Sequence, residues 1–98
     1  MIFRIEQVAL YPPDPEAAMD LLRAMGAESW VHDRVEASGE VFGQAGENVG
    51  TLNFNYDLLG EARELEVLQY EEGPNWMDLR PDADPCRVSH LGMHCTEE

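Results

Sequence analysis

The sequence predicts an α+β fold in which one helix follows the first strand and further strands follow the helix. Side chains of alternating character along residues 3–11 are typical of a strand. Apolar residues at helical spacing follow over residues 15–25. Alternation returns in residues 51–56 and 64–70, which indicates two more strands. These observations predict a βαβββ order with an additional strand near the C-terminus.

The boundaries of the helix are marked by residues that favour its two ends. The Pro12–Pro13 pair ends the first strand, because proline cannot donate an amide hydrogen to a neighbouring strand. Asp14 is a suitable N-cap, and Pro15 is favoured at the first helical position. Gly26 readily adopts the left-handed conformation that ends many helices, so we expect the helix to end there.

The remaining residues divide into strands and connections. We expect residues 29–42 to form a second strand with a polar, bent middle, and the glycine-rich residues 43–50 to form a loop. Residues 58–61 are expected to turn the chain between the third and fourth strands. In terms of domains, residues 1–72 form the βαβββ module, residues 73–86 a linker rich in proline and acids, and residues 87–98 a C-terminal strand.

Composition limits the classes of function. The 98 residues contain 20 acids and 6 basic residues, all arginine, for a net charge of −14, which disfavours binding to nucleic acid. Such a charge favours cations or a basic protein surface. No apolar segment approaches the roughly 20 residues that span a bilayer. Cys86 and Cys95 lack the spacing of a zinc or redox motif, so we expect reduced thiols in a cytoplasmic protein.

Three short motifs carry a resemblance to a known family. Residues 5–11, followed by Pro-Asp-Pro at 13–15 and the helix, form an opening strand with a central glutamine. Residues 64–69 contain a central glutamate, and residues 88–94 form a second opening strand around a histidine. In order and type these motifs resemble the glyoxalase-like module of the vicinal oxygen chelate superfamily, which includes glyoxalase I, extradiol dioxygenases and bleomycin-resistance proteins.

The resemblance implies a divalent metal centre. The matching positions are Gln7, Glu66 and His90, a pattern similar to that of zinc-using glyoxalase I. Such a mixed oxygen and nitrogen set suits Zn, Ni, Mn, Co or Fe(II), and it lacks the thiolates of a structural zinc site. Glu66 is also the candidate catalytic residue, because a carboxylate beside the metal is able to transfer a proton. His32 and His94 are expected at the surface or beside the ligands.

Alternation along each strand supports the same three ligands, because side chains two residues apart share one face of a sheet. Each candidate ligand then lies opposite apolar residues that are suited to packing on a helix. The predicted faces are Ile5, Gln7 and Ala9 on the first strand, Glu64, Glu66 and Leu68 on the fourth, and Val88, His90, Gly92 and His94 on the last.

In this superfamily the metal binds neighbouring oxygens of a small substrate, so the resemblance implies a lyase or isomerase of the glyoxalase kind, or a dioxygenase. The candidate substrate-binding residues are the aromatic Tyr11, Phe54 and Trp76. A complete second module would continue beyond residue 98 to a further glutamate ligand. We therefore expect either a homodimer that exchanges its C-terminal strand to complete the site, or a truncated or degenerate relative.

Two alternatives without a metal remain open. Bleomycin-resistance relatives imply a module that sequesters a small ligand between aromatic walls. The acidic surface also suits a module that binds a basic protein partner. Metal analysis separates these alternatives from the metalloenzyme.

Overall fold

The predicted α+β class and the order of its elements are confirmed by a computed structural model, which describes residues 2–41, 43–60, 63–72 and 88–96. Within these ranges the chain forms one helix and one five-stranded mixed sheet. The elements are β1 (Ile2–Leu10), α1 (Pro15–Ala24), β2 (Trp30–Val41), β3 (Gln44–Asn55), β4 (Glu64–Glu72) and β5 (Val88–Thr96). The predicted linker at 73–86, including Trp76, lies outside the described residues.

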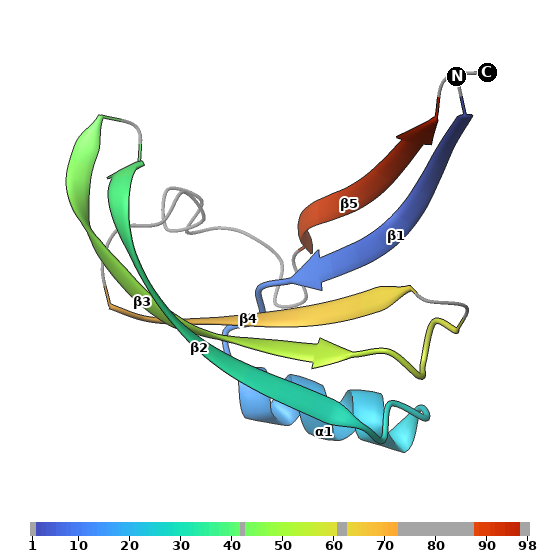
Figure 1. The fold of residues 1–98 in the computed structure, drawn as a ribbon. Coiled ribbons are helices and arrows are strands. Elements are labelled where there is room, and N and C mark those ends of the chain that lie inside the picture. Colours follow the sequence, from blue (N-terminus) through green and yellow to red (C-terminus); the bar gives the residue numbers. More distant parts are fainter. Residues whose placement is uncertain (1, 42, 61–62, 73–87, 97–98) are drawn as a thin grey trace.

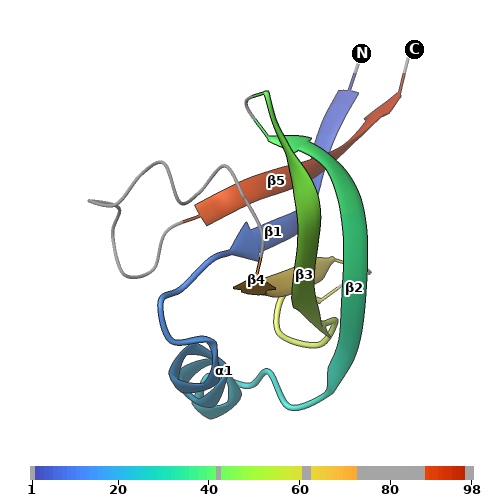
Figure 2. The same cartoon turned by 90° about the vertical axis from the view of Figure 1, so that its left-hand side faces the viewer.

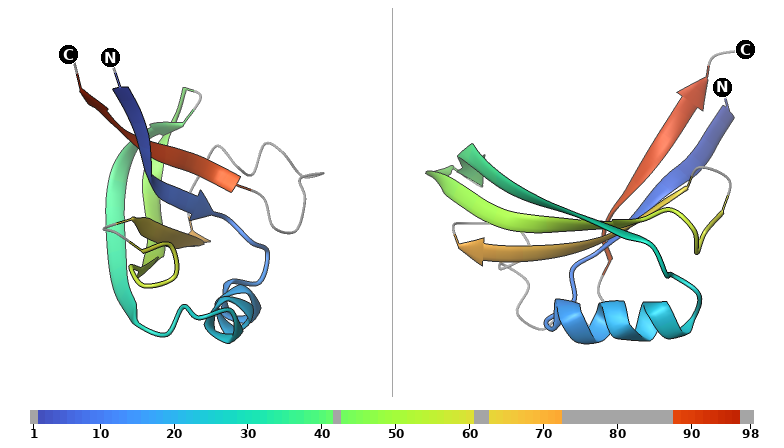
Figure 3. Two further views of the ribbon diagram at one scale, coloured as in Figure 1. Left: turned by 90° about the vertical axis from the view of Figure 1, so that its right-hand side faces the viewer. Right: turned by 60° about the horizontal axis from the view of Figure 1, so that its bottom comes forward.

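The sheet has the strand order β2-β3-β4-β1-β5. β1 runs parallel to β4, whereas the other neighbouring pairs are antiparallel. Figure 1 shows that the sheet curls into an open half-barrel, with α1 against its outer side. Figure 2 shows β2 and β3 as one long curved hairpin, and both views of Figure 3 show β5 beside β1. The helix therefore does not cover the inner, concave face of the sheet.

The helix forms as its terminal residues predict. The Asp14 carboxylate accepts a hydrogen bond from the Ala17 amide at 3.1 Å, and the chain leaves the helix through Gly26 at φ 119°. Met19 is only 1% exposed and anchors α1 on the sheet, where α1 packs mainly against β4. In the described part of the chain, no helix is long and apolar enough to cross a membrane.

The predicted loop at residues 43–50 is wrong. β2 and β3 pair without interruption from Trp30 opposite Asn55 to Val41 opposite Gln44, so residues 44–50 belong to β3 and the positive-φ Gly43 precedes it. Gly46 and Gly50 of this segment are part of β3 instead. A Cβ at Gly50 would lie 2.9 Å from the carbonyl oxygen of Gln69, so glycine at this position permits close approach of β4.

A buried amide fixes the turn that leads from β3 toward β4. Asn55 is fully buried, and its Nδ2 donates to the Ser29 carbonyl at 2.9 Å and to the Asp57 carboxylate at 2.6 Å. Its Oδ1 accepts from the Leu58 amide at 3.0 Å. Because a buried amide that loses such partners is costly, this turn is held in one conformation.

Candidate functional site

The register of the sheet brings the predicted ligands to one face. On one side of β1, Gln7 pairs with Glu64 and Ala9 pairs with Glu66. Residues paired across neighbouring strands project to the same face, so both glutamates share the face of Gln7. Leu65 alternates with these glutamates and is buried toward the side that α1 covers. The glutamates and Gln7 therefore lie on the concave face.

The other side of β1 adds the histidine. β5 pairs His90 with Ala9 and Gly92 with Gln7, so His90 lies diagonally across from Gln7 on the same face. One residue of β5, Ser89, is inserted between the pairs formed by Val88 and His90. This irregularity places His90 next to β1 and buries Ser89.

Three side chains from three strands converge at this place. His90 Nε2 lies 2.9 Å from Gln7 Oε1 and 3.7 Å from Glu66 Oε2. Gln7 Nε2 donates to Glu66 Oε2 at 2.8 Å. The sequence prediction that Gln7, Glu66 and His90 approach one another agrees with these distances. The assignment of a metal to them stays a prediction.

Two further residues belong to this cluster, and we did not predict them as part of the site. Gln7 Nε2 also donates to Glu64 Oε1, and the Tyr56 hydroxyl donates to Glu64 Oε2 at 2.8 Å. A signal for Glu64 was present in the sequence, since it precedes Glu66 by two residues and so shares its face. We define Gln7, Tyr56, Glu64, Glu66 and His90 as the polar cluster.

Burial sets the electrostatics of the polar cluster. Glu66 is only 4% exposed, and burial raises the pKa of its carboxyl above the ordinary value of 4.5. His90 opposes this rise in the pKa, and the negative charge of Glu64 adds to it. The hydrogen bond to Glu64 raises the pKa of Tyr56, which keeps its hydroxyl a donor.

The His90 ring contacts partners at both nitrogens. Its Nδ1 lies 3.2 Å from the hydroxyl of the buried Ser89, while Nε2 faces Gln7 and Glu66. A histidine with its second nitrogen held by a neighbour has a fixed ring orientation, which is typical of metal-binding histidines. The ring is half-exposed, so a ligand has access to it from the concave side.

A bulge in β1 corrects one predicted face. Ile5 pairs with Met93 and Gln7 pairs with Gly92, which leaves Glu6 as an additional residue in β1. Since Gly92 and Met93 are consecutive in β5 and point to opposite faces, Ile5 lies on the face opposite Gln7. The prediction that Ile5 shares the face of Gln7 is therefore wrong, because it assumed a regular strand. The predicted face of Val88 is wrong for the same reason, since Val88 pairs with Leu10 and His90 pairs with Ala9.

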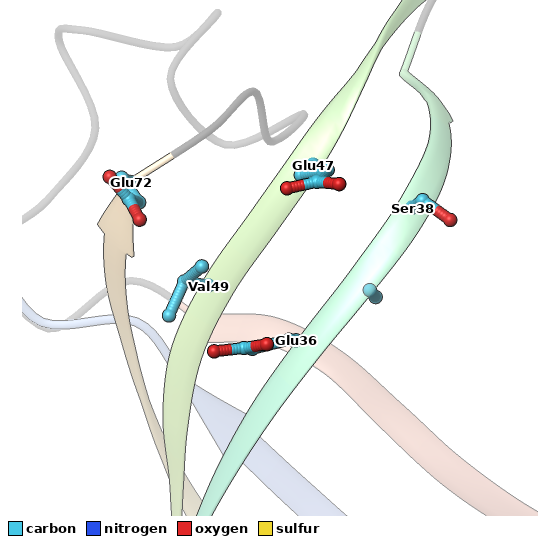
Figure 4. Close-up of a pocket in the computed structure, with 6 residues that line it drawn as sticks. Glu36, Ser38, Glu47, Val49 and Glu72 are labelled. Atoms are coloured by element: carbon cyan, nitrogen blue, oxygen red, sulfur yellow. The ribbon is translucent and has the colours of Figure 1, made fainter.

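A shallow hollow of about 300 Å³ adjoins the polar cluster. It is lined by residues from three strands, β1, β4 and β5, and from the turn after β3, namely Glu6, Gln7, Tyr56, Glu64, Gly92 and Met93. A second hollow, of about 330 Å³, lies on the β2–β3 hairpin (Figure 4). Its lining carries three carboxylates and contains no predicted site residue: Glu36, Ala37, Ser38, Glu47, Val49 and Glu72.

The aromatic residues that were predicted to bind substrate do not all lie near the polar cluster. Phe54 pairs with Glu66 across β3 and β4, and its ring stacks on Tyr56 at a centroid distance of 6.5 Å. Tyr11 instead packs edge-on against Tyr70 at 5.1 Å. Of the two described aromatic candidates, Phe54 is thus the one that lies beside the polar cluster.

The other two histidines lie outside the polar cluster. His32 Nδ1 is 2.5 Å from the Asn53 side-chain oxygen. His94 is exposed and pairs with Arg4 at the far end of β5. Across the described ranges, no group of three or more histidine, cysteine, aspartate and glutamate side chains is placed to hold a metal ion. A three-ligand site here consequently depends on the amide oxygen of Gln7.

The chain was compared with known proteins, and no protein-family model, curated protein or solved structure matches it. The case for a function therefore depends on the polar cluster itself.

Gly92→Ala is expected to displace Gln7, because the added Cβ would lie 2.8 Å from the Cβ of Gln7. We expect a loss of about 1–3 kcal/mol in the free energy of unfolding. The side-chain amide resonances of Gln7 should also shift in an NMR spectrum. Gly39→Ala is the control, because an added Cβ there meets nothing within 4 Å. Equal effects of the two substitutions would contradict the close contact between Gly92 and Gln7.

Glu66→Gln is expected to stabilise the protein at neutral pH. A carboxyl whose folded-state pKa is raised binds its proton more tightly in the folded state. The wild type therefore loses stability as the pH rises above the ordinary value of 4.5, and the glutamine variant does not. Thermal unfolding of both proteins should be followed from about pH 4, near the ordinary carboxyl pKa, to about pH 8. The unfolding midpoints of the wild type and the variant should converge at low pH. Glu40→Gln, at an exposed position, controls for the lost charge.

Proposed function

We propose that the protein binds a divalent metal ion through Gln7 Oε1, the Glu66 carboxylate and His90 Nε2, as a protein of the vicinal oxygen chelate type. The observation that carries this proposal is the approach of His90 Nε2 to Gln7 Oε1 at 2.9 Å and to Glu66 Oε2 at 3.7 Å. The three side chains come from three different strands. Such convergence is required of a site built on the concave face of a sheet.

The spacing of these atoms suits a shared ion. Adjacent ligand atoms about 2.0–2.2 Å from a metal lie roughly 2.8–3.6 Å from one another in octahedral or tetrahedral geometry. The two distances from His90 Nε2, 2.9 and 3.7 Å, are close to that range. A cation would also compensate the burial of the Glu66 carboxylate, which raises its pKa in the absence of an ion.

The chemistry that this donor set supports is carbonyl activation. A bound divalent ion would act as a Lewis acid on adjacent oxygens of a substrate. Glu66 would lie beside the ion as a carboxylate, where it would be placed to accept and return a proton at the neighbouring carbon of the substrate. These features favour a glyoxalase-like lyase or isomerase, with a dioxygenase as the other reaction of this superfamily.

The hollow beside Gln7 is the proposed place of the substrate. It is lined by the carboxylates of Glu6 and Glu64 and by the hydroxyl of Tyr56. These carboxylates, in a chain of net charge −14, repel anions. We therefore propose a small, oxygen-rich substrate that is neutral or cationic, with the ring of Phe54 nearby as an apolar wall.

A metal-free function is the alternative, and one observation favours it. In the described part of the chain, every buried side-chain nitrogen or oxygen has a hydrogen-bond partner. The polar cluster is therefore satisfied by its own members and does not require an ion. In that case the hollow would hold a small ligand without a metal, in the manner of bleomycin-resistance proteins.

We also propose that a second copy of the chain pairs with β5. Within the described sheet, β5 is an edge strand, and its residues include no carboxylate and no arginine, although the whole chain carries 20 acids. The other edge strand, β2, contains Asp33, Arg34, Glu36 and Glu40, and such charges oppose edge-to-edge pairing. Leu91 and Met93 of β5 are about half-exposed. A twofold β5 contact would bury both residues and bring a second concave face alongside the first.

The metal proposal is tested by titrating zinc into the wild type, His90→Ala and His94→Ala by calorimetry. We expect the wild type to bind zinc stoichiometrically. His90→Ala should lose more than about 100-fold in affinity, because removing a ligand costs more than the roughly 10- to 100-fold lost when a residue that supports a ligand is replaced. His94→Ala should change little. Unchanged binding in His90→Ala would mean that the acidic surface collects the ion. No binding by the wild type would favour the metal-free alternative.

The pairing of β5 is tested by light scattering at micromolar concentration. We expect twice the chain mass of 11.1 kDa for the wild type. Leu91→Glu should give the single-chain mass, because it places a carboxylate in the proposed contact. Val31→Glu, at a similarly exposed position in β2, should leave the dimer intact. A wild type of single-chain mass would contradict the proposal.

A further inference from the structure

The orientation of one side-chain amide decides whether position 7 is able to bind a metal ion. A glutamine side chain presents an acceptor oxygen on one side and a donor NH₂ group on the other. Gln7 Nε2 donates to both Glu64 and Glu66, so Oε1 is turned toward His90 Nε2. The opposite orientation would place Oε1 against two carboxylates and the NH₂ group against the metal.

We propose that Glu64 is a positioning residue, which holds the amide of Gln7 so that its oxygen faces the metal position. This inference rests on the proposed function. Glu64 lies directly beside Gln7 in the register of β1 and β4. It touches the metal position only through Gln7, and its role is to select one of the two orientations of the amide.

Glu64, rather than Glu66, is suited to this role when an ion is present. Glu66 Oε2 accepts from Gln7 Nε2 in the structure, but the same oxygen would then be occupied by the ion. Glu64 Oε1 would remain as the acceptor for Gln7 Nε2. Before the metal binds, both N–H groups of the Gln7 amide thus donate hydrogen bonds. After it binds, the hydrogen bond to Glu64 would remain.

Tyr56 orients Glu64 in turn. Its hydroxyl donates to Glu64 Oε2 at 2.8 Å, while Glu64 Oε1 accepts from Gln7. Both oxygens of Glu64 are therefore occupied by hydrogen bonds that run away from the metal position. This arrangement distinguishes Glu64 from a ligand, and it links the start of the β3–β4 turn to β1 and β5.

The inference is tested by zinc affinities of paired substitutions at positions 64 and 6. Glu6 lines the same hollow, and its carboxylate accepts a hydrogen bond from Arg4. Its substitution therefore changes the local charge without removing a hydrogen bond of the Gln7 side-chain amide. Glu64→Lys places a donor against Gln7, and we expect the amide to turn and the affinity to fall about 10- to 100-fold more than in Glu6→Lys. Glu64→Gln keeps an acceptor oxygen for the amide of Gln7. Its zinc affinity should therefore lie within about threefold of that of Glu6→Gln, a smaller difference than the roughly 10-fold or more expected between the two lysine variants.

Other roles of Glu64 predict different results. If its charge alone mattered, the effects at positions 6 and 64 would be similar for each replacement. If Glu64 were a ligand, Glu64→Gln would lose clearly more affinity than Glu6→Gln, because a neutral amide oxygen would replace a charged carboxylate on the ion. Either result would overturn the inference while wild-type binding upheld the proposed function. A wild type that binds no zinc would overturn both.

A compensating substitution gives an independent test. In Glu64→Lys, replacing Gln7 by Glu removes the need for orientation, because a carboxylate presents oxygen on both sides. We expect the double variant Gln7→Glu/Glu64→Lys to regain at least about tenfold in zinc affinity over Glu64→Lys alone. In the absence of metal, NMR should show the Gln7 side-chain amide resonances shifted in Glu64→Lys and unchanged in Glu6→Lys. No recovery together with unchanged resonances would overturn the inference.

Discussion

The pairing of β1 on both of its sides is the constraint on which the site depends. β4 lies parallel to β1 on one side and β5 antiparallel on the other, so one strand fixes the positions of two others. Glu64 and Glu66 of β4 and His90 of β5 reach Gln7 only in this register. A shift of one residue in either pairing would turn the corresponding side chains to the outer face. The bulge at Glu6 and the close contact of Gly92 with Gln7 locate that register.

The polar cluster is held together at an electrostatic cost. Glu66 is buried beside Glu64, and both burial and the neighbouring charge raise its pKa. The amide of Gln7 moderates this cost by donating to both carboxylates. His90 lies on the other side of Glu66, and it also opposes the rise in the pKa. A buried carboxylate whose pKa is raised by burial and a neighbouring like charge is a frequent feature of functional sites, because such surroundings tune the proton affinity of the group.

Much of this arrangement could be predicted from the sequence, for a reason that also explains the errors. Alternation within β4 is a local property, so the shared face of Glu64 and Glu66 was visible from their spacing. The bulge at Glu6 was not visible in the sequence, because it arises from pairing with β5. The predicted face of Ile5 was therefore wrong. The same holds for Tyr56, whose role depends on contact with another strand. The glycines at 43–50 misled the prediction because glycine favours loops and also close contacts between strands.

The presence of an amide rather than a carboxylate or an imidazole at position 7 follows from its neighbours. A carboxylate there would add a third negative charge beside Glu64 and Glu66, at hydrogen-bonding distance from Glu66 Oε2. A neutral imidazole has one donor, which is too few for two acceptors. Glutamine alone among these side chains offers two donors on one atom and an acceptor oxygen on the other side. The two glutamates of β4 therefore determine both the type of residue at position 7 and the direction in which its oxygen points.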